Sequence, residues 1–340
     1  MLVLFASLAL AEEAPPIING STTSDHKPVG AILSIYGNQG GNFCSGTLVA
    51  PRYVITAAHC IEAAEDYERQ GWEIWFMVGT KVYNQGSWDD YAEVKNMWRH
   101  PGYTGGSSID DDIGVLELKS SIAGSIGTYS VNTGRPTQGW YGTDITYVGW
   151  GISDDNGSGS GTKRTVDVPV YGWDNSYIYT YSGDSGTIKN ICSGDSGGAA
   201  LKVIEGELVL AGANSFGFNL YGGNPDCERQ GAAAGATRID AYYSWITGYI
   251  PEDEIGTIEE EADADTDADS DSDSDADGDT DSDTDTDWDT ALGADTGNDP
   301  LRPLGEGTPS GLCSATPAAS GMMGLLAALG FAFARRRRGR

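Results

Sequence analysis

The chain has 340 residues, enough for one large domain or two small ones together with tails. Its formal net charge is -30, and fourteen of the carboxylates occupy every odd position from Asp263 to Asp289, so the rest of the chain is only moderately acidic. Basic side chains cluster only at Arg335–Arg338, a distribution that argues against nucleic-acid binding.

The N-terminal residues are typical of an export signal. Leu2–Ala11 is apolar and ends in the small-residue cleavage pattern Ala9-Leu10-Ala11, although the basic residues that usually precede such a run are missing. We therefore expect residues 1–11 to be a signal peptide, the alternative being a buried first strand. Residues 12–16 form a polar, proline-bearing spacer that we interpret as a short pro-segment.

Short apolar runs separated by turns, with abundant Gly, Ser, Thr, Tyr and Trp, predict an all-β domain over residues 17–250. A short helical turn is expected at 61–68, a connection between two halves at 119–135, and a closing helix at 241–250, which ends before Pro251. The expected strands are residues 29–36, 43–50, 53–56, 73–78, 92–98, 113–118, 144–150, 165–171, 198–203, 207–214 and 235–239.

Five cysteines, at positions 44, 60, 192, 227 and 313, constrain the compartment. Four of them lie in the β-rich part, so the simplest count is two disulfides and one unpaired thiol. Because disulfides persist in oxidising compartments, this count supports export.

The segment Ser193–Gly198, with the sequence SGDSGG, carries the clearest indication of chemistry. A serine hydroxyl is a weak nucleophile and needs a base and backbone donors, and the flanking glycines would let the amides of Gly194 and Ser196 face a substrate carbonyl. The alternative is an ordinary surface turn. Ser185 stands in the similar run Gly183–Gly186, which lacks the preceding cysteine and the second glycine.

His59 and Asp112 are the candidates that could activate Ser196. His59 follows two alanines and precedes a cysteine, where it is either a structural residue or a rigidly held general base. Asp112 heads an apolar strand that would draw its carboxylate toward the core, where it could orient the imidazole. The two aspartates before it are interpreted as a solvated turn.

Four blocks, in this order, resemble the signature blocks of trypsin-like (chymotrypsin-family) serine proteases: Ile17–Gly20 (IING), Thr56–Cys60 (TAAHC), Asp112–Leu116 (DIGVL) and Gly194–Gly198 (GDSGG). The resemblance extends over Ile17 to about Ile250. It implies a fold of two antiparallel six-stranded β-barrels with the active site in the cleft between them.

The resemblance also implies roles for the residues of these blocks. His59 would be the general base, Asp112 its orienting carboxylate and Ser196 the nucleophile, with an oxyanion hole formed by the amides of Gly194 and Ser196. The implied disulfides are Cys44–Cys60 and Cys192–Cys227.

Activation and specificity follow from the same resemblance. A new N-terminal amine on Ile17 would pair with Asp195, yet Pro16 stands before Ile17 where an Arg or Lys is usual, so the activating enzyme is left open. Asn190 falls at the floor of the substrate pocket, whose other implied residues are Ser215, Phe216 and Gly217. Because a buried cation needs a paired charge, we expect a neutral residue, apolar or aromatic, before the cut.

The rest of the chain is expected to be a tether and an anchor. Residues 251–310 have too few apolar side chains to form a core and are predicted to be a disordered acidic spacer, in which Asp271–Asp279 could bind calcium weakly; no other metal or cofactor is expected. Residues 311–340 resemble a myxobacterial C-terminal sorting tag: Cys313 as processing or anchoring point, a short transmembrane segment at Ala318–Ala334, and the arginine cluster.

We therefore expect an exported, surface-displayed or secreted serine endopeptidase. It would be a monomer that cleaves proteins or peptides, and its partners would be an activating protease and the sorting machinery. Two alternatives are a catalytically silent adhesin or binding domain on the same barrels, and a calcium-binding spacer protein that carries the domain as cargo.

Overall fold

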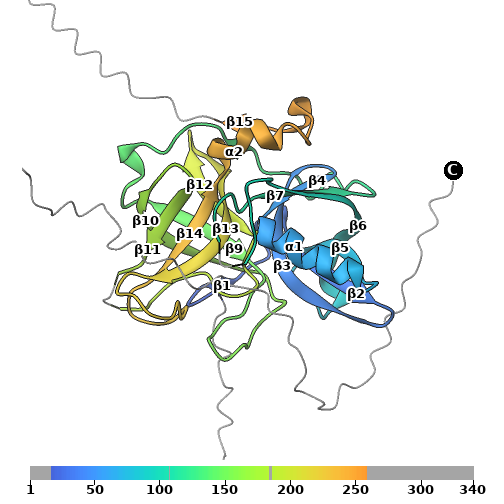
Figure 1. The fold of residues 1–340 in the computed structure, drawn as a ribbon, viewed down its shortest axis with the longest axis horizontal. Helices are drawn as coiled ribbons and strands as arrows, with labels where there is room; N and C mark the ends of the chain where they lie inside the picture. The colour runs from blue at the N-terminus through green and yellow to red at the C-terminus, as the bar shows by residue number, and fades with distance from the viewer. Residues whose placement is uncertain (1–16, 107, 184–185, 259–340) are drawn as a thin grey trace, which may run out of the picture.

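A computed structural model describes residues 17–106, 108–183 and 186–258 of the chain. Within them the chain forms two β-barrels that lie side by side, the first in blue to teal and the second in green to orange (Figure 1). The expectation of two six-stranded antiparallel barrels is confirmed.

The first barrel closes in the order β2-β3-β4-β7-β6-β5, and every pairing is antiparallel. Apolar residues of these strands, such as Ile32, Leu48, Phe76 and Leu116, point inward and fill its interior. Its strands are β2 (Val29–Tyr36), β3 (Gln39–Ala50), β4 (Tyr53–Thr56), β5 (Glu73–Gly79), β6 (Trp88–Arg99) and β7 (Gly114–Leu118).

The second barrel closes in the order β9-β10-β11-β14-β13-β12, with β12 returning to β9. Its interior holds apolar side chains, among them Tyr147, Ile178 and Val209. Three two-residue strands lie outside the ring: β1 (Ser21–Thr22) pairs with β10, and β8 (Val131–Asn132) runs parallel to both β13 and β15 (Thr257–Ile258). The ring strands are β9 (Asp144–Gly149), β10 (Arg164–Trp173), β11 (Tyr177–Tyr181), β12 (Ala199–Ile204), β13 (Glu207–Asn219) and β14 (Ala232–Arg238).

One apolar cluster joins the two barrels. It combines Ile55 and Val115 of the first barrel with Val148 and Leu201 of the second, and all four are fully buried. Residues from α2 (Ile239–Ile246) pack against the same cluster. The barrels are therefore held to each other by a shared core, which fixes the segments that face each other across their junction.

The helices and strands differ from the sequence expectations in a few places. Helix α1 spans Ala58–Arg69 rather than 61–68, so His59 lies in its first turn. Helix α2 begins two residues earlier and ends four residues earlier than the expected 241–250. Strand β11 was not predicted, and the expected connection at 119–135 contains β8. Three short 3₁₀ turns, at Gln85–Ser87, Gln138–Trp140 and Glu252–Glu254, complete the described elements.

Several predicted segments fall outside the described residues. They are the signal peptide, the pro-segment, the spacer beyond Ile258, Ser185 and the tag with Cys313. In the part of the chain that the structure describes, neither helix has the length and apolar character needed to cross a bilayer.

Candidate active site

The core of the site is a buried pair formed by His59 and Asp112. Helix α1 starts shortly after β4, and its first turn brings the backbone N–H and the ring Nδ1 of His59 to the Asp112 carboxylate. The backbone N–H of His59 donates to Oδ1 of Asp112 over 2.9 Å, and Nδ1 of the ring lies 2.8 Å from Oδ2. Both carboxylate oxygens therefore face the histidine. Asp112 is 0% exposed, so these contacts are shielded from water.

This geometry sets the protonation behaviour of His59. Burial disfavours the charged ring, but the charge of Asp112 and its hydrogen bond outweigh burial and raise the pKa of His59 above its ordinary value. With Nδ1–H directed at Asp112, Nε2 carries the ring's lone pair. Nε2 is buried and has no hydrogen-bond partner among the described residues. The ring is therefore held so that Nε2 can accept a proton.

Asp112 is held by further hydrogen bonds from the second barrel. The hydroxyl of Ser215 donates to Oδ2 of Asp112, and the hydroxyl of Thr237 donates to its backbone oxygen over 2.9 Å. Sequence analysis placed Ser215 in the substrate pocket, but in the structure its hydroxyl is directed at Asp112. No sequence pattern shows this contact, because Ser215 is 103 positions away and is brought there by the packing of the barrels.

Asp111 differs from its predicted role. The sequence indicated a solvated turn, but Asp111 is only partly exposed and accepts a hydrogen bond from the Tyr242 hydroxyl of α2 over 2.8 Å. Asp111 has a φ of 54°, and the carboxylates of Asp111 and Asp112 face different partners, Tyr242 and His59. Asp110, by contrast, is exposed as expected.

Ser196 lies in a tight turn that the glycines make possible. Gly194 has φ 93° and Gly197 has φ 76°, values that side-chain-bearing residues rarely adopt. A Cβ on Gly197 would collide with Oγ1 of Thr56, at the end of the strand that leads to His59. Ser196 is 3% exposed, and its carbonyl oxygen accepts the backbone N–H of Ser45 over 2.8 Å.

The turn and the histidine are neighbours across the junction between the barrels. The carbonyl oxygen of Ser196 lies 3.5 Å from Sγ of Cys60, the residue that follows His59. The sequence-predicted His59, Asp112 and Ser196, which are up to 137 positions apart by their numbers, are therefore brought to one place.

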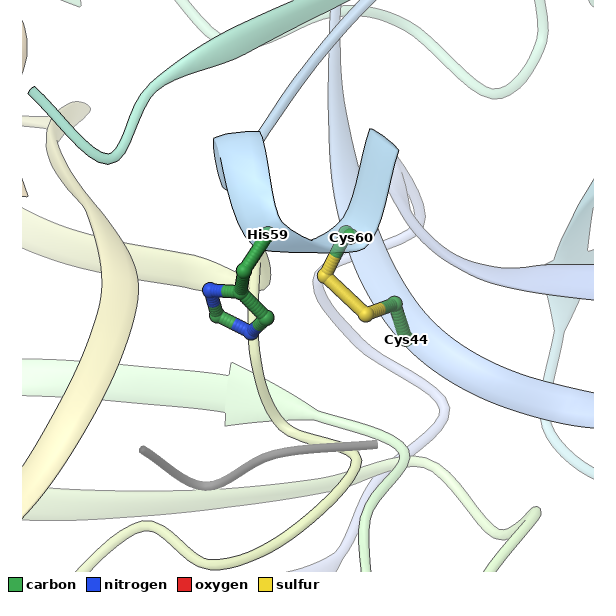
Figure 2. A group of neighbouring side chains, drawn as sticks. All are labelled: Cys44, His59 and Cys60. Atoms are coloured by element: carbon green, nitrogen blue, oxygen red, sulfur yellow. A yellow bond between two sulfur atoms is a disulfide. The ribbon is translucent and has the colours of Figure 1, made fainter. Parts of the chain in front are cut away.

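Both disulfides implied by the family resemblance are present. Cys44–Cys60 joins β3 to the first turn of α1, and Cys192–Cys227 fixes the segment before Ser196. Figure 2 shows that the side chains of His59 and Cys60 leave the same helical turn on different sides, and that Cys60 is bonded to Cys44. These three side chains have the composition of a metal cluster, but sulfur in a disulfide offers no thiolate ligand.

Asp195 is buried next to the turn. Its carboxylate accepts the backbone N–H of Gly151 over 2.8 Å and that of Cys192 over 2.9 Å. Burial raises the pKa of Asp195 to about 7, although these hydrogen bonds and the positive charge of Arg164 act in the opposite direction. Among the described residues, no ion pair includes Asp195.

The predicted pocket residues are buried near the same turn. Asn190 is 2% exposed, forms an isolated β-bridge with Ile18 and uses its side-chain oxygen to accept the backbone N–H of Ile191. Phe216 packs on Gly235 so closely that a Cβ there would collide with its ring. A small apolar hollow lies elsewhere, on the first barrel, and its lining includes none of the predicted site residues.

Comparisons with known proteins agree with this geometry. A family model described as Trypsin matches residues 17–246. The chain is 25% identical over 236 residues to a trypsin of Saccharopolyspora erythraea, which covers 66% of this chain and 92% of that protein. It is 28% identical over 222 residues to Trypsin-1 of Astacus astacus, covering 60% of this chain and 86% of that protein.

A third relative is longer than the matched region. The chain is 25% identical over 263 residues to the vitamin K-dependent protein C of Rattus norvegicus, which covers 72% of this chain. The chain spans 54% of that protein, about half of its length.

Proposed function

The chain belongs to the trypsin family and is a serine endopeptidase, and we propose that His59, Asp112 and Ser196 are its catalytic residues. The observation that carries this proposal is the state of His59. One ring nitrogen is bonded to a fully buried carboxylate and the other has no described partner, while Cys60, the residue after His59, lies against the Ser196 turn.

The proposed mechanism follows from these contacts. Nε2 of His59 takes the proton of the Ser196 hydroxyl as its oxygen attacks the substrate carbonyl carbon. The imidazolium that forms is stabilised by Asp112, and its proton passes to the leaving amine when the peptide bond breaks. Water then gives a proton to Nε2 as its oxygen attacks the acyl carbon. The bond from that carbon to the Ser196 oxygen breaks, and the proton on Nε2 passes to this oxygen, which restores the Ser196 hydroxyl and releases the acid.

The oxyanion hole is proposed to consist of the amides of Gly194 and Ser196. Both N–H groups belong to the turn shaped by Gly194 and Gly197, and backbone hydrogen bonds from Asp195 N–H to Cys192 and from Gly197 N–H to Asn214 fix this turn. Such a preorganised pair of donors stabilises the negative charge of the tetrahedral intermediate.

Activation is proposed to occur by release of the Ile17 amine. Ile17 is 1% exposed, and the next residue, Ile18, donates its backbone N–H to the oxygen of Asn190 over 2.9 Å, so this segment is already buried beside the pocket. Ile17 has φ 45°, a conformation that costs a β-branched residue about 1–3 kcal/mol. Cleavage before Ile17 removes that restraint and creates a cation that can pair with Asp195.

Specificity for a neutral residue before the cut is part of the proposal. Asn190, assigned to the pocket floor, is uncharged, and Gly217 pairs in register with Ala234, so small residues line this part of the β13–β14 ladder. A substrate ammonium or guanidinium would find no carboxylate at Asn190 to offset its desolvation.

Export and surface display are likewise proposed. Two disulfides support an oxidising compartment, and the sequence supplies the apolar Leu2–Ala11 run and the Cys313, Ala318–Ala334 and Arg335–Arg338 order described above. The acidic segment between them would act as a tether, and the sorting machinery and an activating protease would be the partners.

The test is hydrolysis of a peptide library by the full chain and by Ser196→Ala. We expect the rate constant of the variant to fall at least about 10³-fold, because the nucleophile is removed. Ser193→Ala, in the same turn and half-buried, is the matched control and should stay within about threefold of the parent. Equal losses in both variants, or activity in Ser196→Ala, would refute the assignment.

A further inference from the structure

Arg164, the first residue of β10, is a buried cation that none of the roles above uses. It is 3% exposed, and its guanidinium is permanently charged. Nη1 donates to the backbone oxygens of Gly159 over 2.9 Å and Thr162 over 2.8 Å, which fixes the side chain in place.

The strand register places the Arg164 side chain on the same face of the sheet as the Asp195 carboxylate. Arg164 pairs directly with Gly149 of β9. Directly opposed residues of an antiparallel pair point to the same face of the sheet. A Cβ on Gly149 would collide with Oδ1 of Asp195, so the Asp195 carboxylate lies on the face to which Arg164 also points.

The other neighbour of Arg164 is the strand that follows Ile17. Arg164 also pairs with Thr22 of β1, so its backbone lies between the N-terminal segment and the strand that touches Asp195. The positive charge of Arg164 is among the influences that lower the pKa of Asp195 against the effect of burial.

The Ser196 turn is formed in a chain that is continuous before Ile17. With that peptide bond intact there is no Ile17 amine, yet the Asp195 carboxylate already accepts the N–H groups of Gly151 and Cys192, and the Gly198 N–H donates to the backbone oxygen of Asp195. The residue before Ile17 is proline, not the Arg or Lys that a protease of trypsin specificity would cut after.

We propose that Arg164 is a positioning residue that supplies positive charge to Asp195 from within the domain and so keeps the Gly194–Ser196 turn formed before the Ile17 amine is released. The uncleaved chain is then an active peptidase, and release of Ile17 increases an existing activity. This inference rests on the proposed function, because it assigns the turn to catalysis.

The test compares two forms of the full chain. In both, residues 12–16 are replaced by a leader that a specific protease removes to leave Ile17 as the N-terminus; one form keeps the leader and the other has lost it, as verified by mass spectrometry. We expect the leader-retaining parent to hydrolyse peptides, with Arg164→Gln lowering its kcat/KM at least tenfold. The same substitution should cost less than threefold once the Ile17 amine is free.

Charge should decide the effect. Arg164→Lys should restore at least a third of the activity of the leader-retaining form. The matched control is Lys163→Gln, which removes a neighbouring buried cation whose Nζ donates to the His26 backbone oxygen, and it should affect both forms equally.

Three results would overturn the inference. The first is an inactive leader-retaining parent together with an active Ile17-terminal form. This result overturns the inference even if Arg164→Gln does not fold. Equal losses from Arg164→Gln in both forms would show a purely structural role, and failure of Arg164→Lys to restore activity would show that charge is not the reason. Inactivity of both parent forms, by contrast, would refute the proposed function and the inference with it.

Discussion

Replacing Asp112 by asparagine tests how the site holds His59. The carboxylate accepts three N–H or O–H groups: the backbone and ring of His59, and the hydroxyl of Ser215. Asparagine keeps the size but has one oxygen and one NH₂ group. Whichever way its amide points, one His59 donor faces NH₂, or the ring must change tautomer and place its proton on Nε2.

The expected loss follows from that tautomer. A His59 ring protonated on Nε2 cannot accept the proton of Ser196, so the general-base contribution of about 10²–10⁴-fold in kcat should disappear. The donor mismatch should also lower the free energy of unfolding by about 1–3 kcal/mol. Because the charge of Asp112 and its hydrogen bond raise the pKa of His59, the acid limb of the pH–rate profile should move to lower pH in the variant.

The assay is kcat against pH for the parent, Asp112→Asn and Asp111→Asn. Asp111 is the matched control, because it is the adjacent carboxylate and its described hydrogen bond comes from Tyr242 rather than His59. Asp111→Asn should stay within about threefold of the parent. A folded Asp112→Asn variant that keeps more than a tenth of the parent kcat, or an equal loss in Asp111→Asn, would refute this reasoning.

Three further predictions concern the pocket, the buried acid and the first disulfide. Asn190→Asp should raise kcat/KM at least about tenfold for peptides with Arg or Lys before the cut, since a buried carboxylate can pair with the cation; an unchanged preference in the peptide library would contradict its pocket role. Because burial raises the pKa of Asp195 in the uncleaved chain to about 7, its contribution to stability is full below about pH 4 and is lost as the pH rises through 7. Asp195→Asn should therefore flatten the pH dependence of urea unfolding by up to about 4 kcal/mol, and parallel curves for parent and variant would argue against the raised pKa. Replacing Cys44 and Cys60 by serine opens a loop with a sequence separation of 16, so the free energy of unfolding should fall by about 3 kcal/mol, and an unchanged urea midpoint would be the contrary result.

The sequence predicted strands well where alternation and turns agree. Residues 29–36 and 53–56 match β2 and β4 at both ends. Strand β11 (Tyr177–Tyr181), a short run that pairs with β10 and β14, was missed although its residues favour strands. Helix α1 was predicted too short, since the contacts of its first turn with Asp112 and Cys44 are not visible as local propensity.

The site could be predicted where chemistry and motif coincide. His59, Asp112 and Ser196 stand in distinctive blocks, and the structure brings them together. The contact of Ser215 with Asp112 and the position of Arg164 could not be predicted, because each depends on which residue of one strand faces which residue of another.

The most direct measurement of the central claim is covalent labelling of the full chain with a serine-directed phosphonylating inhibitor, mapped by peptide mass spectrometry. The account predicts one adduct, on Ser196, that is lost in Ser196→Ala and forms at least about 10²-fold more slowly in His59→Ala. An adduct on Ser185, or labelling of Ser196 at the same rate with and without His59, would contradict it.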